Sequence, residues 1–262
     1  MKTILLTLAK CLAFFLGWAI AAGLCPLPSA VSPAVWRLWA EITPLLAICL
    51  FTALFWGIEK RSLRLCLFRF PGKGLLIGAS AGLFWLGAPV LLLWGMGAAH
   101  FTHAGPVEAL PLWWIAACLN VATQELLVRG YMYQLIKQRH NLPAAVIVTS
   151  LLFTLLHGGA LEAGLVPTLN VLSMSLLMTI VLEYSGSLLA PILMHAIWNS
   201  VGALLLGGVS LADDYPHLLS MVLTGSELIT GGPCKVEGSI IVLAVNLLLI
   251  GVFFILYKKQ RA

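Results

Sequence analysis

The chain has 262 residues, of which 61% are hydrophobic and only 10% are charged, and its mean hydropathy is +1.01. This composition excludes an ordinary soluble protein and indicates a membrane protein. The formal net charge of +5 is interpreted as topology and contact with anionic membrane lipid, and not as a nucleic-acid surface.

About eight apolar segments follow one another, and each is long enough to cross the hydrocarbon core, which takes about 20 helical residues. In lipid only helices and closed barrels satisfy the backbone, and the segment lengths favour helices. Gly, Pro and Asn separate the segments as turn residues. We therefore predict an all-α fold, a polytopic membrane helix bundle that forms one domain over residues 1–262. The predicted spans are 3–24, 36–58, 75–97, 110–139, 142–158, 165–184, 187–208 and 239–257.

Lys and Arg are distributed unevenly between the two sides that alternating spans create. One side carries most of these basic residues, whereas the opposite, outer side carries little beyond Arg37 and Lys235. By the positive-inside rule, we predict that both termini are cytoplasmic. The basic residues on the cytoplasmic side are Lys2, Lys60, Arg61, Arg64, Arg69, Lys73, Lys137, Arg139, Lys258, Lys259 and Arg261.

Two features near the termini leave alternatives open. The first apolar segment resembles a signal peptide, since Lys2 precedes it, but it is too long for an ordinary signal-peptide core. We therefore predict a retained helix. Of the six cysteines, Cys25 and Cys234 are both predicted on the outer side, where a disulfide between them is one alternative.

Several polar side chains lie inside the predicted spans, where they are costly and therefore indicate a functional site. The alternative is that they only join helices through hydrogen bonds. We interpret Asn120 and Asn170 in that way, although Asn170 can instead line a cavity. The candidate site residues are Gln124, Glu125 and Arg129 in the fourth span, Phe153 and His157 in the fifth, and His195 and Asn199 in the seventh.

The spacing of these residues pairs them on helix faces, because residues four apart share one face. Glu125 and Arg129 are four apart and can form an ion pair, while Gln124 projects about 100° away from Glu125. Phe153 lies four residues before His157, and the same spacing separates the histidine and asparagine of the seventh span. Each pair is predicted to present one surface to the interior of the bundle.

Depth gives a second reason to expect one cavity. Counted from the cytoplasmic helix ends, Gln124 and His157 lie about 22 to 24 Å deep, and His195 and Asn199 about 12 to 18 Å deep. Tilted helices can bridge this difference. We therefore predict that the fourth, fifth and seventh spans enclose a polar cavity that opens toward the cytoplasm.

The segments "QELLVR", "FTLLH" and "HAIWN" occur in this order on three predicted spans. They resemble the three signatures of the CPBP family, which are glutamate-glutamate-x-x-x-arginine, phenylalanine-x-x-x-histidine and histidine-x-x-x-asparagine. The family includes type II CAAX prenyl endopeptidases and bacteriocin-processing or self-immunity proteins. The resemblance covers about residues 110–205. It implies an intramembrane endopeptidase of a bacterial plasma membrane that cleaves a peptide or protein terminus.

The resemblance implies that the first glutamate of the motif is the general base that activates water. Gln124 stands at this position, and an amide cannot take a proton from water near neutral pH. Glu125 and Arg129 match the second glutamate and the arginine, which brace the site. Two readings therefore stay open. In the first, Glu125 is released from Arg129 and activates the water. In the second, the site binds a peptide without cutting it, as in a self-immunity or membrane-assembly factor.

The resemblance also implies that His157 and His195 hold the water and polarise the attacked carbonyl. Asn199 matches the asparagine that stabilises the oxyanion, and Phe153 completes the second motif as a bracing residue. No cofactor is required, although the two histidines and Glu125 can bind zinc with an open position. No HExxH motif occurs, which counts against the zinc alternative, and no predicted span holds an aspartate, which argues against an aspartyl protease.

Overall fold

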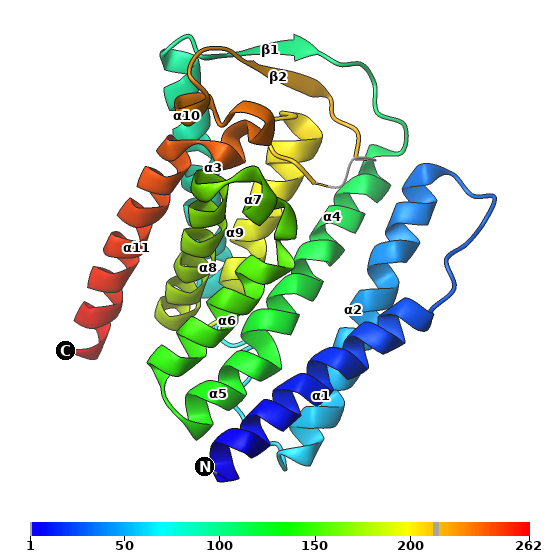
Figure 1. Cartoon of the computed structure of the whole chain (residues 1–262), viewed down its shortest axis with the longest axis vertical. Helices are drawn as coiled ribbons and strands as arrows, with labels where there is room; N and C mark the ends of the chain where they lie inside the picture. Colours follow the sequence, from blue (N-terminus) through cyan, green and yellow to red (C-terminus); the bar gives the residue numbers. More distant parts are fainter. Residues whose placement is uncertain (1, 212–214) are drawn as a thin grey trace. The chain divides into compact units, whose positions relative to one another are not determined.

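The computed structural model describes residues 2–211 and 215–262 and consists mainly of helices (Figure 1). These residues fall into two compact units. Unit 1 comprises Met1–Leu67 and Ala109–Thr149, and unit 2 comprises Phe68–Glu108 and Ser150–Ala262. The chain passes from unit 1 to unit 2 for the last time between Thr149 and Ser150, within helix α6 (Leu142–Leu156).

Each predicted span corresponds to a helical segment. Five of the described segments are long and apolar enough to cross a membrane, whereas α6 and the run Leu189–Leu205 are shorter apolar helices. The prediction of a polytopic membrane helix bundle is confirmed, and the number of spans stays a prediction. The segments are α1 (Lys2–Leu24), α2 (Pro33–Ile58), α3 (Pro71–Gly95), the run of α4 (Leu110–Glu125), η1 (Leu126–Met132) and α5 (Tyr133–Arg139), α6, α8 (Leu165–Ser185), α9 (Leu189–Asn199) with η2 (Ser200–Leu205), and α11 (Ile240–Arg261).

The outer faces of several helices are apolar. On α1, Leu5 is 62% exposed and Leu6 is 58% exposed, and on α11 the neighbouring Leu247 and Leu248 are each 57% exposed. Exposed leucines in continuous rows are unfavourable in water and suit the hydrocarbon of a bilayer. The protein is therefore an integral membrane protein.

In unit 1, α1 packs against α2, and α2 packs against α4 and η1. Three aromatic rings fill the space between these helices. The ring of Phe14 on α1 lies 5.5 Å from that of Phe55 on α2 and 4.8 Å from that of Tyr131 on η1. All three side chains are buried, so this cluster joins the two halves of unit 1 that are distant in the sequence.

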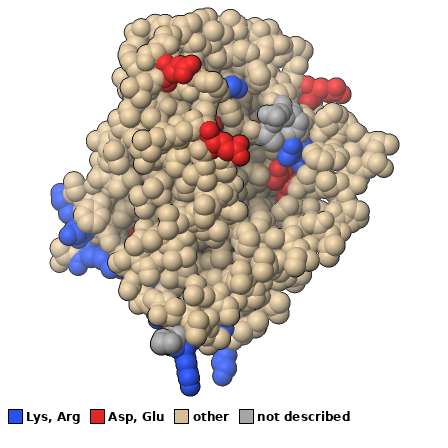
Figure 2. All heavy atoms as spheres, viewed as in Figure 1, with Lys and Arg blue, Asp and Glu red and all other residues tan. Residues whose placement is uncertain are grey.

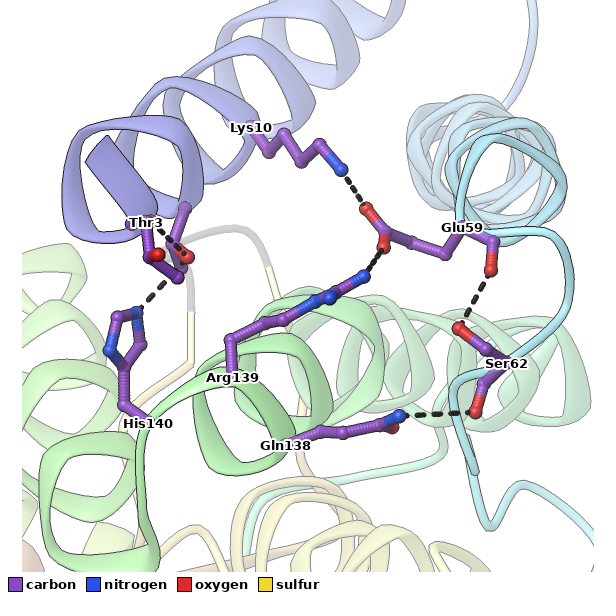
Figure 3. A network of polar contacts seen from close by, with 8 residues as sticks. Thr3, Lys10, Glu59, Ser62, Gln138, Arg139 and His140 are labelled. Atoms are coloured by element: carbon purple, nitrogen blue, oxygen red, sulfur yellow. Dashed lines mark hydrogen bonds and ion pairs between the residues drawn. The ribbon is translucent and has the colours of Figure 1, made fainter.

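A charged network lies at the end of unit 1 where α2 finishes (Figure 3). The carboxylate of Glu59, which caps α2, accepts hydrogen bonds from Lys10 of α1 and, at 2.7 Å, from Nη2 of Arg139 of α5. Glu59 is only 4% exposed. Burial raises the pKa of this carboxyl, but the hydrogen bonds and charges of Lys10 and Arg139 outweigh burial, so its pKa is lowered overall.

In unit 2, glycines let α3 approach α9 closely. Gly74, Gly78 and Gly82 recur every four residues on α3 and face the α9 region. A Cβ atom on Gly78 would lie 2.6 Å from the carbonyl oxygen of Ala190, and one on Gly82 would lie 2.9 Å from the Cα atom of Met194. Larger residues would push away the helix that carries His195.

Polar bonds also join the helices of unit 2. Nδ2 of Asn170 on α8 donates to the carbonyl oxygens of Glu237 at 2.7 Å and Ser239 at 2.9 Å, at the start of α11. Nε1 of Trp85 on α3 donates to Oδ1 of Asn246 on α11 at 2.5 Å. The prediction that Asn170 joins elements through hydrogen bonds is confirmed.

The segments between the helices of unit 2 contain a short ribbon that the all-α prediction missed. Strand β1 (Ala99–His103) pairs antiparallel with β2 (Leu219–Leu223). This ribbon lies at the end of unit 2 opposite the C-terminus of α11 (Figure 1). The remaining short elements are α7 (Gly158–Ala163), α10 (Glu227–Thr230) and η3 (Gly232–Gly238). Cys25 and Cys234, for which a disulfide was one alternative, are both free thiols.

The last turn of α11 holds Lys258, Lys259 and Arg261. Lys and Arg side chains gather where this helix finishes (Figure 2). The positive-inside rule predicts that this end of unit 2 faces the cytoplasm. A reporter fused after Ala262 is therefore expected to be cytoplasmic in a protease-accessibility assay. A reporter inserted after Gly105, in the predicted outer segment, is the matched control, and an extracytoplasmic C-terminal reporter would overturn the predicted topology.

Removal of the Glu59 charge tests the network of unit 1. We expect Glu59→Gln to lower the free energy of unfolding by about 1 to 3 kcal/mol, since hydrogen bonds to a charged group are lost. The pKa of Glu59 is lower in the folded state, so this stabilisation is present above the unfolded pKa and is lost as the pH falls through the folded pKa. Thermal unfolding in detergent, near neutral and in acidic buffer, measures both effects. Glu108→Gln, which removes an exposed carboxylate, is the control; equal melting of both variants near neutral pH would contradict this assignment.

Candidate active site

The motif residues fall into both units, and each set has its own geometry. The first motif, with Gln124, Glu125 and Arg129, lies in unit 1. The second and third motifs lie in unit 2. The convergence of the two sets around one cavity, predicted from their shared depth, stays a prediction.

Glu125 and Arg129 form a buried ion pair in unit 1. Oε1 of Glu125 lies 3.1 Å from Nη1 of Arg129, and both side chains are 0% exposed. The ion pair predicted from the four-residue spacing is confirmed. Removal of one partner from such a buried pair costs about 3 to 5 kcal/mol, because the other charge is left uncompensated.

Gln124 ends a chain of hydrogen bonds that starts on α2. Nε2 of Gln124 donates to Oδ1 of Asn120 at 2.6 Å, and Nδ2 of Asn120 donates to Oε2 of Glu41 at 3.0 Å. Oε1 of Glu41 accepts from Nη1 of Arg37 at 3.4 Å. The predicted helix-joining role of Asn120 is confirmed. The sequence analysis did not identify Glu41 as a partner of the site, although an acidic residue inside an apolar helix was a signal.

The helices change their winding directly after two motif residues. Glu125 is followed by the π-helical segment η1, in which Gly130 leaves helical geometry at φ −75° and ψ −112°. Asn199 is followed by the π-helical segment η2. Such segments occur mostly at functional sites, because the wider turn re-aims the side chains around it. No sequence pattern predicted either segment.

In unit 2, His157 lies outside the helix predicted for it. Helix α6 ends at Leu156, and His157 has φ −100° and ψ 52°, directly before the pair Gly158 and Gly159. The predicted end at residue 158 is therefore wrong by two residues, because these glycines favour a break in the helix. Nδ1 of His157 lies 2.8 Å from the carbonyl oxygen of Phe153. A carbonyl only accepts, so Nδ1 carries the hydrogen and the neutral ring has its lone pair on Nε2.

Phe153 brings the two motif histidines together. Its ring lies 4.3 Å from that of His157 and 6.1 Å from that of His195, the latter edge-on. Phe153 and His195 are each 1% exposed. Asn199, which is 5% exposed, ends α9 one helical turn after His195. Unit 2 therefore gathers two imidazoles around one buried aromatic ring, with the asparagine on the same helix.

Trp198 is a supporting residue that sequence reasoning missed. Its ring stacks on that of Trp85 at 4.1 Å, and its Nε1 donates to Oε1 of Glu237 at 3.3 Å. Oε2 of Glu237 accepts from the backbone N–H of Ser210 at 2.9 Å. These contacts tie the helix that carries His195 and Asn199 to α3 and η3. Both tryptophans lie in the middle of predicted apolar spans, and no sequence pattern distinguished them from other core residues.

The zinc alternative requires three ligands. Within either unit, no three His, Cys, Asp or Glu side chains of the described residues converge as a metal-binding group. His157 and His195 supply two nitrogens, but the expected third ligand, Glu125, is paired with Arg129. The described residues therefore fit zinc only in part, and we derive no step through a metal.

The comparisons with known proteins bear on the same part of the chain. No curated protein and no solved structure matches it. The family model described as type II CAAX prenyl endopeptidase Rce1-like matches residues 106–201, which include all three motifs. The match supports a CAAX-type intramembrane protease. Residues 106–201 therefore match the model of the type II CAAX prenyl endopeptidase Rce1-like family, and the resemblance read from the three motifs is confirmed.

Proposed function

We propose that the protein is a slow intramembrane endopeptidase that hydrolyses a peptide bond with water held at His157 and His195. The observation that carries this proposal is the pairing of the two motif histidines around Phe153. The family match over residues 106–201 supports the same class of reaction. His195 is buried and His157 is half-buried, and polar rings inside a membrane protein are costly, which favours a functional role.

His157 is the proposed general base. Its Nδ1–H is held by the carbonyl oxygen of Phe153, so Nε2 presents the lone pair. Nε2 takes a proton from the water as the water oxygen bonds to the carbonyl carbon of the peptide. His195 polarises that carbonyl, and the amide N–H of Asn199 donates to the oxyanion. The carbon–nitrogen bond then breaks, and His157 returns the proton to the leaving amine.

Gln124 cannot supply the general base that the family motif has at this position. Its amide oxygen can accept a hydrogen bond from water, but it cannot hold a proton near neutral pH. A positioned general base contributes about 10² to 10⁴ in rate. Without a carboxylate at this position, the natural chain is expected to cleave slowly.

Glu125 braces the site in this proposal. It would have to leave Arg129 to act as a base, and both side chains are fully buried. Loss of a buried pair costs about 3 to 5 kcal/mol, which is comparable with the whole gain expected from a base. The ion pair therefore favours bracing over proton transfer.

The proposed substrate is a short peptide or a protein terminus that enters from the cytoplasmic side or from the bilayer. The family description names CAAX prenyl endopeptidases. Peptides that end in a CAAX sequence, with and without a prenyl group, are therefore the first substrates to test. The proposed setting is a bacterial plasma membrane, with membrane lipid as the surrounding partner and no nucleic acid.

One observation favours a second candidate function. The base position is an amide whose NH₂ group is engaged with Asn120. A site of this kind can bind a peptide without cutting it, as in a bacteriocin self-immunity or membrane-assembly factor. Such a factor retains its biological effect when a catalytic histidine is removed, whereas an endopeptidase loses it.

Alanine at either histidine tests the endopeptidase directly. We expect His157→Ala and His195→Ala each to lower the cleavage rate by at least about 10², because the proton acceptor or the carbonyl contact is removed. The rate is measured with a CAAX-type peptide and purified protein, with thermal unfolding as the check on folding. His103→Ala, at an exposed position outside the motifs, is the control. Full cleavage by either motif variant, or loss with a chelator that zinc restores, would contradict the scheme.

Glu125→Gln distinguishes bracing from proton transfer. We expect the free energy of unfolding to fall by about 3 to 5 kcal/mol, since Arg129 is left as a buried charge. The rate per folded molecule is expected to stay close to that of the natural chain. Cleavage and unfolding are measured on the same preparation. A variant that folds normally but has lost cleavage would identify Glu125 as the working base.

A further inference from the structure

We infer that Glu41, acting through Asn120, is a positioning residue that decides which end of the side chain at position 124 is available to the site. Its catalytic consequence rests on the proposed function, whereas its structural consequence does not. The inference comes from the direction of the hydrogen bonds that link Arg37, Glu41, Asn120 and Gln124.

The direction of this chain starts at Glu41. Its carboxylate is 6% exposed, and the Arg37 guanidinium compensates its charge. An ionised carboxylate only accepts hydrogen bonds, so Asn120 must turn its NH₂ group toward Glu41. The carbonyl oxygen of Asn120 then faces residue 124. Only a donor at position 124 satisfies this arrangement.

Gln124 supplies that donor through Nε2, at 2.6 Å from Oδ1 of Asn120. Its other end, Oε1, is buried, and within the described part of unit 1 it accepts no hydrogen bond. A buried acceptor of this kind is costly unless a water or a bound molecule donates to it. The geometry therefore presents Oε1 as an acceptor for a water molecule or for an N–H group of a bound peptide.

The same chain explains why a carboxylate does not fit at position 124. A glutamate there would place an acceptor opposite the carbonyl oxygen of Asn120. Rotation of the Asn120 amide would satisfy residue 124, but it would turn the carbonyl oxygen onto Glu41. Glu41 and an ionised glutamate at position 124 would therefore compete for the one NH₂ group of Asn120, so the two carboxylates disfavour each other.

An exchange of the two residue types reverses the chain. In the double variant Glu41→Gln with Gln124→Glu, the NH₂ group of the new amide can meet the carbonyl oxygen of Asn120. The NH₂ group of Asn120 then meets the new carboxylate at position 124. The two hydrogen bonds of Asn120 are kept with their directions inverted, Arg37 can still donate to the amide oxygen at position 41, and the base position of the family motif holds a carboxylate again.

The test is a double-mutant cycle on the full chain in detergent, with the thermal midpoint as the first readout. We expect Gln124→Glu alone to lower the midpoint by several degrees and to be much better tolerated in the Glu41→Gln background. The coupling is expected to disappear when Asn120→Leu is added to all variants. The matched control combines Glu108→Gln with Gln124→Glu, and we expect no coupling between these two changes. Additive effects of the Glu41 and Gln124 changes would overturn the inference.

Cleavage of a CAAX-type peptide is the second readout. The double variant is expected to exceed the natural chain by up to about 10² to 10⁴, the contribution of a positioned base, and Gln124→Glu alone to gain far less. Equal gains from the single and double variants would contradict the role of Glu41. Thermal coupling without cleavage by any variant would support the hydrogen-bond chain and refute the proposed function. Cleavage without thermal coupling would support the proposed function and refute the role of the hydrogen-bond chain.

Discussion

A polar side chain inside a membrane helix must find its hydrogen-bond partner within the protein, and that partner then fixes the direction of the next bond. The chain from Arg37 through Glu41 and Asn120 to Gln124 follows this constraint step by step. In water, each group could turn to the solvent and the identity of residue 124 would matter little. In lipid, a carboxylate on α2 determines what the site on α4 can hold.

The second half of the candidate site depends on packing more than on charge. Glycines on α3 allow α9 to lie close, and Trp198 stacks on Trp85 of the same partner helix. Phe153 then fills the space between the two histidine rings. An imidazole held by one backbone carbonyl and one aromatic face has a defined tautomer and orientation, as a group that handles a proton requires.

The helices and the intrahelical contacts could be predicted from the sequence. Length and apolarity define membrane segments, and the spacing of Glu125 and Arg129 determines their ion pair because both lie on one helix. The bond between Asn120 and Glu41 joins residues 79 positions apart, and it depends on how two helices rotate against each other. The break at His157, the π-helical turns and the ribbon of β1 and β2 also depend on tertiary contacts, which override local preference. The bond between Lys10 and Glu59 could not be predicted either, because Lys10 lies within an apolar segment and Glu59 follows the next helix.

In the proposed function, this membrane protein uses water to cut a peptide bond, although an amide occupies the base position. Incubation of the purified full chain with a CAAX-type peptide in water enriched in oxygen-18, followed by mass spectrometry of the products, tests this reaction. We expect slow formation of a shortened peptide whose new carboxyl terminus carries a single oxygen-18 atom. Recovery of only intact peptide, bound to the protein after prolonged incubation, would contradict hydrolysis and identify a binding protein.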